Sequence, residues 1–120
     1  MELLKNRDHE ERPWGSFDRF TLNEPSTVKL LTLKPGEEIS LQKHQKRGEF
    51  WRVVRGSGTA TIGGRMLLAG EGSEFSIAPG VEHRLKAGPE GLGWLEIALG
   101  KFSENDEARL ADDYQRGSPQ

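Results

Sequence analysis

Four residues with metal-binding side chains occur at spacings that would let them meet: Gln42, His44, Glu49 and His83. Gln42 and His44 lie two positions apart in a β-rich stretch, so strand alternation sends both side chains to one face. Glu49 follows a loop and can return on the next strand to face them, while His83 follows a Pro-Gly turn far downstream. Two imidazoles, a carboxylate and an amide oxygen suit one divalent metal ion, with zinc as our first choice ahead of cobalt, manganese, iron or nickel.

Short strands separated by glycine turns must position these side chains. Turn signals recur at Pro35-Gly36, Gly56-Ser57-Gly58, Gly63-Gly64, Gly70-Glu71-Gly72 and Pro79-Gly80. Between the turns we predict strands near residues 27–34, 39–44, 49–55, 59–62, 65–68, 74–78, 82–86 and 94–99. Many short strands joined in this way predict an all-β sandwich or small barrel, and their order suits a jelly roll. The segment 103–116, with Ser103 as N-cap, is the helical candidate.

Alternation within the strand predicted over 39–44 has a consequence for assembly. If the face with His44 points into the barrel, Ile39 and Leu41 point outward. Exposed apolar side chains on the outer wall of a sheet need cover, from a second subunit or from the N-terminal arm with Trp14 and Phe17. We therefore predict a homodimer.

The residues around the predicted metal ligands resemble a known family. Gly36, His44, Glu49 and Gly56 match the first cupin motif, in which Gln42 stands where most cupins have another histidine. With that substitution, the pattern SLQxHxxRxE is similar to the cupin domain of type II phosphomannose isomerases, often found as the C-terminal part of a bifunctional mannose-1-phosphate guanylyltransferase. The segments RPWGSF at 12–17, HRL at 83–85 and RLADDYQR at 109–116 extend the resemblance over nearly the whole chain.

This resemblance implies both a fold and an activity. The fold would be a cupin jelly-roll β-barrel, or double-stranded β-helix, with a short C-terminal helical or irregular tail. The activity would be a metal-dependent interconversion of mannose 6-phosphate and fructose 6-phosphate through a cis-enediolate, whose negative charge the ion would stabilise. The substrate would then be a small sugar phosphate.

Two arginines match the family and are candidates for holding the substrate's phosphate. Arg47 corresponds to the family's HxxR and is expected in a loop at the mouth of the cavity, where a guanidinium would bind phosphate in a bidentate manner. The alternative for Arg47 is an ordinary solvated loop arginine. Arg84 also matches, but alternation from an inward His83 turns it away from the cavity.

The catalytic base remains unknown from the sequence. Glu82 and Glu96 fall on faces opposite His83 and opposite the apolar series Leu95, Ile97 and Leu99, so neither is assigned. Trp51 shares a face with Glu49, which places it in the same cavity, and we interpret it as a core residue rather than a sugar-stacking platform.

Departures from the family pattern leave two further functions open. Ala78, Ala87 and Ala98 replace residues that the second cupin motif and the last strand usually carry. The alternatives are a non-catalytic metal-binding cupin module that recognises a sugar or other small ligand, and a different metal-cupin enzyme such as an oxygenase.

Composition sets the outer limits. The 120 residues predict one cupin domain over 1–120, with a charged arm at 1–11, a barrel core at about 12–102 and a tail at 103–120. A net charge of −2 provides no long-range field for nucleic acid or an anionic membrane. With no cysteine, no signal-like N-terminus and no apolar run of membrane-spanning length, we expect a cytoplasmic protein.

Overall fold

A computed structural model of the chain describes residues 3–100 and 107–111, and within these ranges every regular element is a strand. The nine strands are β1 (Asp8–Arg12), β2 (Gly15–Arg19), β3 (Ser26–Leu33), β4 (Leu41–His44), β5 (Gly48–Ile62), β6 (Arg65–Gly70), β7 (Glu74–Ile77), β8 (His83–Leu99) and β9 (Glu107–Ala111). The predicted all-β class is confirmed. The described residues contain no helix long and apolar enough to span a membrane.

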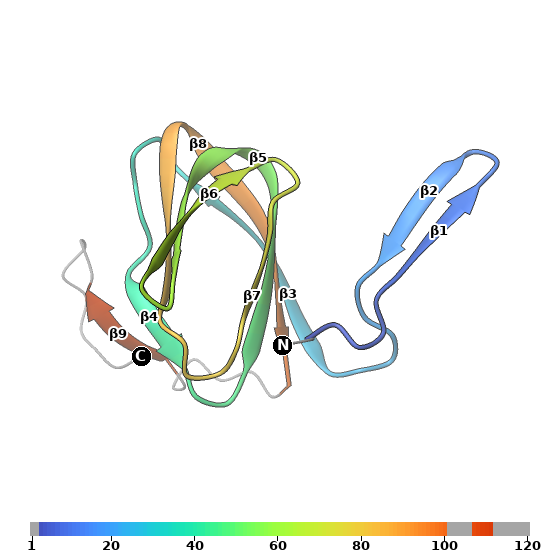
Figure 1. The fold of residues 1–120 in the computed structure, drawn as a ribbon, viewed down its shortest axis with the longest axis horizontal. Coiled ribbons are helices and arrows are strands. Elements are labelled where there is room, and N and C mark those ends of the chain that lie inside the picture. Colours follow the sequence, from blue (N-terminus) through green and yellow to red (C-terminus); the bar gives the residue numbers. More distant parts are fainter. Residues whose placement is uncertain (1–2, 101–106, 112–120) are drawn as a thin grey trace.

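Two long, bent strands organise the barrel (Figure 1). β5 and β8 pair antiparallel from one wall to the other, with register shifts at Val53/Arg55 and Gly56/Gly58. The first part of β5 also pairs with β7 and its second part with β6, while β8 pairs with β4 and β3. We predicted two separate strands in place of β5 and two in place of β8, because glycine-rich stretches resemble turns. In the structure these stretches are bulges through which the pairing of β5 with β8 continues.

Gly56 illustrates why such a bend needs glycine. Its φ is +77°, a left-handed value that L side chains rarely adopt, and a Cβ built there would lie 2.1 Å from the carbonyl oxygen of Gly91. The two long strands therefore approach one another at a point where no side chain fits.

The C-terminal tail differs from the prediction. Residues 107–111 form β9, which pairs antiparallel with β4, so the helix predicted over 103–116 is wrong where the structure describes it. β4 offers unpaired backbone groups along this edge, and hydrogen bonding to them outweighs a short helix with one N-cap. The rest of the predicted helix lies outside the described residues.

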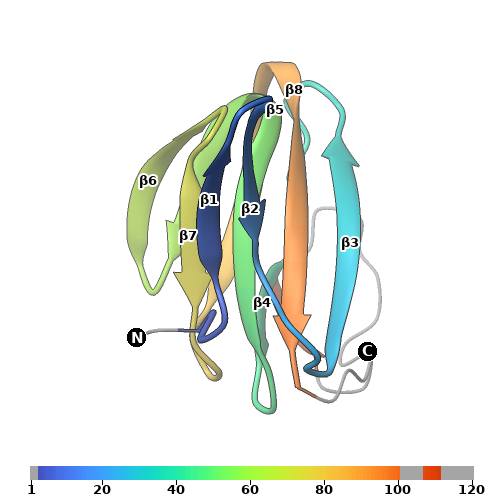
Figure 2. The same cartoon turned by 90° about the vertical axis from the view of Figure 1, so that its right-hand side faces the viewer.

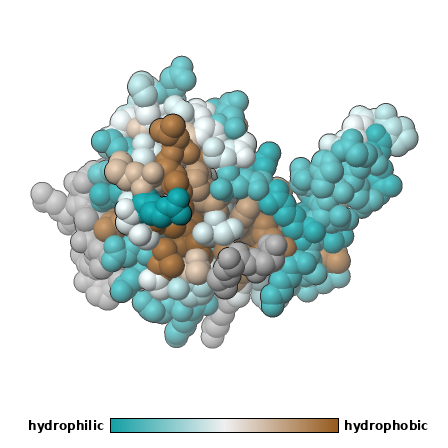
Figure 3. Space-filling view, viewed as in Figure 1, coloured by the Kyte–Doolittle hydropathy of each residue, from teal (hydrophilic) through white to brown (hydrophobic). Residues whose placement is uncertain are grey.

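The strands β1 and β2 form a hairpin that projects from the barrel (Figure 1). They pair only with each other within the described part of the chain, and Trp14 is exposed in the turn between them. The predicted boundary between arm and core, near residue 12, falls inside this hairpin. Figure 3 shows its surface as mostly hydrophilic, whereas apolar surface gathers on the barrel.

The apolar residues form two clusters, one on each side of the wall made by β5 and β8. The barrel interior contains Trp51, Trp94, Ile77, Leu85 and Leu92, and the outer cluster contains Leu4, Phe50 and Ile97 with Phe20, Leu95 and Leu99 beside them. The N-terminal segment thus covers part of the outer wall through Leu4 and Phe20, and not through Trp14 and Phe17, which were our alternative to cover by a second subunit.

Ile39 was also predicted to point outward, and that prediction is wrong. Ile39 packs against the interior cluster, and the neighbouring Ser40 is fully buried. The reason is local, since β4 begins only at Leu41 and the strand alternation does not extend back to residue 39.

Candidate metal centre

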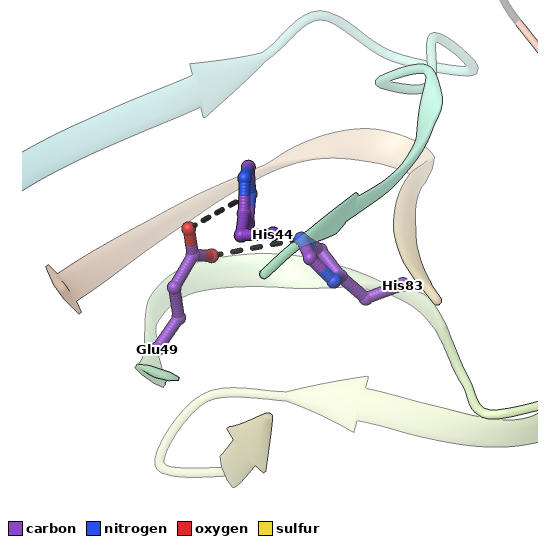
Figure 4. Close-up of side chains that lie close together, drawn as sticks. All are labelled: His44, Glu49 and His83. Atoms are coloured by element: carbon purple, nitrogen blue, oxygen red, sulfur yellow. Dashed lines mark ion pairs between the residues drawn. The ribbon is translucent and has the colours of Figure 1, made fainter. Parts of the chain in front are cut away.

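Three of the four predicted ligands meet inside the barrel. His44 ends β4, Glu49 lies near the start of β5, and His83 begins β8; all three side chains are buried. One ligand atom from each lies within 4.8 Å of the other two, and Figure 4 shows the rings and the carboxylate converging. Strand pairing brings together positions that are separated by up to 39 residues of sequence.

The separations match what a single ion requires. His44 Nε2 lies 3.1 Å from Glu49 Oε2, and His83 Nε2 lies 3.7 Å from Glu49 Oε1. Two ligands that are each about 2.0–2.2 Å from one ion, at angles near tetrahedral or octahedral, are about 2.8–3.6 Å apart. These two separations are close to that range, and all three ligand atoms lie within 4.8 Å of one another.

His83 is held in the tautomer that metal binding needs. Its Nδ1 lies 3.0 Å from the carbonyl oxygen of Val81 and donates to it, which leaves the lone pair on Nε2. That Nε2 atom is buried without a hydrogen-bond partner among the described residues. Burial lowers the pKa of His83, with Glu49 opposing the shift, so the ring stays neutral with an unused lone pair.

Glu49 supplies the negative charge of the centre. Burial alone would raise its pKa, but the hydrogen bond with His44 and the charges of His83, His44 and Arg47 lower the pKa to about 2. Trp51 Nε1 donates to Oε1 at 3.1 Å and Arg47 Nε donates to Oε2 at 3.2 Å. The carboxylate is therefore ionised and held at both oxygens.

Gln42 lies beside this group on the same face. It pairs directly with His83 across β4 and β8, and its Nε2 donates to Ser40 Oγ at 2.8 Å. This hydrogen bond orients the amide and leaves its oxygen available as an acceptor. Its role as a fourth ligand stays a prediction.

The two candidate phosphate-binding arginines lie in different places. Arg47 is not in a solvated loop at the cavity mouth: only 4% of it is exposed, because its guanidinium pairs with the buried Glu49. Arg84 faces outward, as alternation predicted; its Nε donates to the carbonyl oxygen of Ile39 at 3.0 Å and it pairs with Glu38.

Sequence reasoning missed Glu96, although it correctly placed Trp51 in this cavity. Glu96 is 8% exposed and pairs across the strands with Trp51. Burial and, after it, the charge of the adjacent Glu49 raise the pKa of Glu96 to about 7, with Lys29 and Arg47 opposing the shift. The missed signal was that Trp94 and Ala98 alternate with Leu95 and Ile97, so this strand is apolar on both faces and buried on both.

These residues fit a divalent metal ion. The orphaned nitrogen of His83, the ionised Glu49 and the nearby His44 form a buried, mixed nitrogen and oxygen donor set inside the barrel. A divalent ion in this position would supply Lewis-acid stabilisation to an oxygen atom of a bound ligand. The protein's own residues would hold the ion and exclude water around it.

Comparison with curated proteins shows that this chain is similar to part of several longer biosynthetic proteins. It is similar to a mannose-1-phosphate guanylyltransferase of Escherichia coli K12, 39% identical over 116 residues, which cover 93% of this chain and 24% of that protein. It is also similar to the xanthan biosynthesis protein XanB of Xanthomonas campestris, 40% identical over 107 residues, covering 88% of this chain and 23% of that protein. The chain spans about a quarter of the length of these relatives.

Solved structures support the cupin fold. Oxalate decarboxylase from Bacillus subtilis matches with a TM-score of 0.64 and 32% identity, covering 72% of this chain and 24% of that one. A cupin protein from Bacteroides fragilis matches with a TM-score of 0.58 and 21% identity, covering 79% and 78% of the two chains, which shows the fold alone. The predicted cupin double-stranded β-helix is therefore confirmed.

The predicted isomerase activity is not confirmed. The matching relatives are named as guanylyltransferases and as xanthan and alginate biosynthesis proteins, and what this chain shares with them is a cupin domain rather than a catalytic isomerase.

One family profile covers nearly the whole chain. It matches residues 2–113 and is described as mannose-6-phosphate isomerase, C-terminal. The matched region includes β1 to β9 and all four predicted metal ligands. The chain therefore belongs to this C-terminal cupin family, whose members include domains of mannose-1-phosphate guanylyltransferases.

Proposed function

We propose that this chain is a metal-binding cupin module that binds a mannose phosphate and serves guanylyl transfer without catalysing isomerisation. The observation that carries the proposal is the buried group of His44, Glu49 and His83, in which His83 Nε2 keeps an unused lone pair. The donor set favours zinc among the borderline divalent ions. The ligand class follows from the relatives, which are named for mannose 1-phosphate.

Calorimetry with mannose 1-phosphate tests this function. We expect the zinc-loaded full chain to bind one equivalent, because the ion and its cationic neighbours would hold the anionic ligand, and we expect no binding after chelation. Arg84→Met serves as a control, since Arg84 lies on the outer face of the barrel and should not change binding. Absence of binding to the zinc-loaded chain, or turnover of mannose 6-phosphate into fructose 6-phosphate, would contradict the proposal.

We also propose a homodimer, formed through β3. Figure 2 shows β3 at the edge of the sheet, and among the described residues it pairs only with β8. Val28 and Leu30 lie exposed on its outer face, next to the Leu95 and Ile97 positions of the outer apolar cluster. Antiparallel pairing of two β3 edges about a two-fold axis would continue the sheet and bring the apolar pairs together.

The dimer proposal predicts that Leu30→Lys produces a monomer. In the wild-type dimer the Leu30 side chains of the two subunits would pack together, whereas in the variant two ammonium groups would repel each other there. Light scattering coupled to gel filtration measures the mass. Leu68→Lys is a matched control, since Leu68 is 90% exposed on β6, in the other wall. A wild-type monomer, or a dimer that survives Leu30→Lys, would rule out this interface.

A further inference from the structure

Trp51 connects the apolar core of the barrel to the candidate metal centre. It lies in β5 two positions after Glu49, so strand alternation turns both side chains into the interior. The residue is 1% exposed and belongs to the interior apolar cluster, where its ring centroid lies 6.3 Å from that of Trp94. Close packing of this kind holds a side chain in one rotamer. Trp51 is therefore a fixed group beside the metal centre.

The same indole contacts two of the three candidate ligands. Its Nε1 donates to Glu49 Oε1 at 3.1 Å, and its ring meets the His83 ring edge-on, with the centroids 5.4 Å apart and the planes at 75°. An indole N–H carries no charge and offers no lone pair, so it holds the carboxylate without repelling or binding an ion. A carboxylate oxygen has lone pairs enough to accept this hydrogen bond and bind an ion at the same time.

The orientation of the Glu49 carboxylate depends on what donates to each oxygen. The terminal torsion of a glutamate side chain has no sharp preference of its own, so the neighbouring groups must set it. Arg47 Nε donates to Oε2, the oxygen that lies 3.1 Å from His44 Nε2. Trp51 donates to Oε1, the oxygen that lies 3.7 Å from His83 Nε2. With both donors in place, the carboxylate presents one oxygen to each histidine.

We propose that Trp51 is a positioning residue for the metal ion, which it serves by fixing the Glu49 carboxylate between His44 and His83. Without the indole N–H, the cationic Arg47 on the other oxygen is no longer balanced, and the carboxylate turns toward it. This role differs from that of a core residue alone and from that of a platform for a sugar ring. The inference rests on the metal binding that is part of the proposed function.

A pair of tryptophan variants tests this role. Trp51→Phe keeps an aromatic ring in the core but removes the N–H, so zinc affinity measured by chelator competition should fall about tenfold or more, as for other supports of metal ligands. Trp94→Phe is the matched control, because Trp94 is equally buried in the same cluster and its Nε1 has no hydrogen-bond partner among the described residues. It should bind zinc like the wild type. Equal zinc affinities in the two variants would overturn the proposal.

Nuclear magnetic resonance of the unmodified chain gives a readout that does not depend on a variant folding. The three tryptophans give three indole N–H signals. On addition of zinc the Trp51 signal should shift most, because its proton lies on the carboxylate that takes up the ion, and those of the exposed Trp14 and of Trp94 should shift less. If the chain binds one zinc ion and the Trp51 signal moves no more than the Trp94 signal, the positioning role is wrong although the proposed function survives. If the wild-type chain binds no zinc, both are wrong.

Discussion

Replacing Glu49 with glutamine should abolish stoichiometric zinc binding by this chain. The substitution keeps the size of the side chain and its hydrogen bond from Trp51 Nε1, but removes the negative charge that lies between His44 and His83. We expect zinc affinity to fall by more than about 100-fold, which exceeds the 10- to 100-fold losses typical of residues that only support a ligand. Calorimetric titration of chelator-treated protein measures the change.

A second acidic residue provides the control for this variant. Glu74 also accepts hydrogen bonds from two arginines, Arg7 and Arg52, but on the outside of the barrel. Glu74→Gln should bind zinc with wild-type affinity. Equal losses in the two variants would indicate that zinc binding depends on general stability, and retained affinity in Glu49→Gln would remove Glu49 from the ligand set.

The second large effect concerns Glu96 and pH. Burial and the neighbouring Glu49 raise the pKa of Glu96 from its ordinary value to about 7, with Lys29 and Arg47 opposing. In the unfolded chain Glu96 ionises near pH 4.5, whereas in the folded metal-free protein it stays protonated until about pH 7. The unfolded state therefore gains stability relative to the folded state as pH rises through this window, by up to about 3 kcal/mol.

Glu96→Gln should remove this loss, because the amide resembles the protonated acid and cannot ionise. Urea unfolding in the presence of chelator should give similar free energies of unfolding for variant and wild type near pH 4, and a more stable variant at pH 8. The lowered pKa of His83 favours folding as pH rises, but that effect is common to both proteins. If the difference in free energy of unfolding between variant and wild type stays constant from pH 4 to pH 8, Glu96 is not buried beside Glu49.

Residue types and strand alternation were sufficient to predict much of the metal centre. The two-residue spacing of Gln42 and His44 placed them on one face, and Glu49 and Trp51 share the next face in the structure as expected. His83 follows its Pro-Gly turn and enters the same interior. These predictions succeeded because each depended on local periodicity within one short strand.

Predictions failed where the outcome depended on pairing between distant segments. Glu96 was placed outside because its neighbours are apolar, but those neighbours pack beneath Leu4 and Phe20 from the other end of the chain. Arg47 was expected in a loop at the mouth of the cavity, since nothing local indicates that its charge balances a buried Glu49. Residues 107–111 became a strand only because β4 offers a free edge.

The prediction of isomerase activity failed for a different reason. The cupin spacing specifies a site for an ion, and a site for an ion is compatible with many reactions and with binding alone. Arg47 and Arg84 match a family pattern in the sequence, and in the structure they lie apart, Arg47 paired with Glu49 and Arg84 with Glu38. The cupin spacing correctly predicted that His44, Glu49 and His83 would meet, but it did not predict the chemistry.

Anomalous diffraction at the zinc edge from crystals of the zinc-loaded chain tests the central claim most directly. The account predicts one strong peak inside the barrel, about 2.0–2.2 Å from His44 Nε2, His83 Nε2 and a Glu49 oxygen. A peak confined to the exposed group of His9, Glu11 and Asp18 on the hairpin, with none between His44, Glu49 and His83, would contradict it.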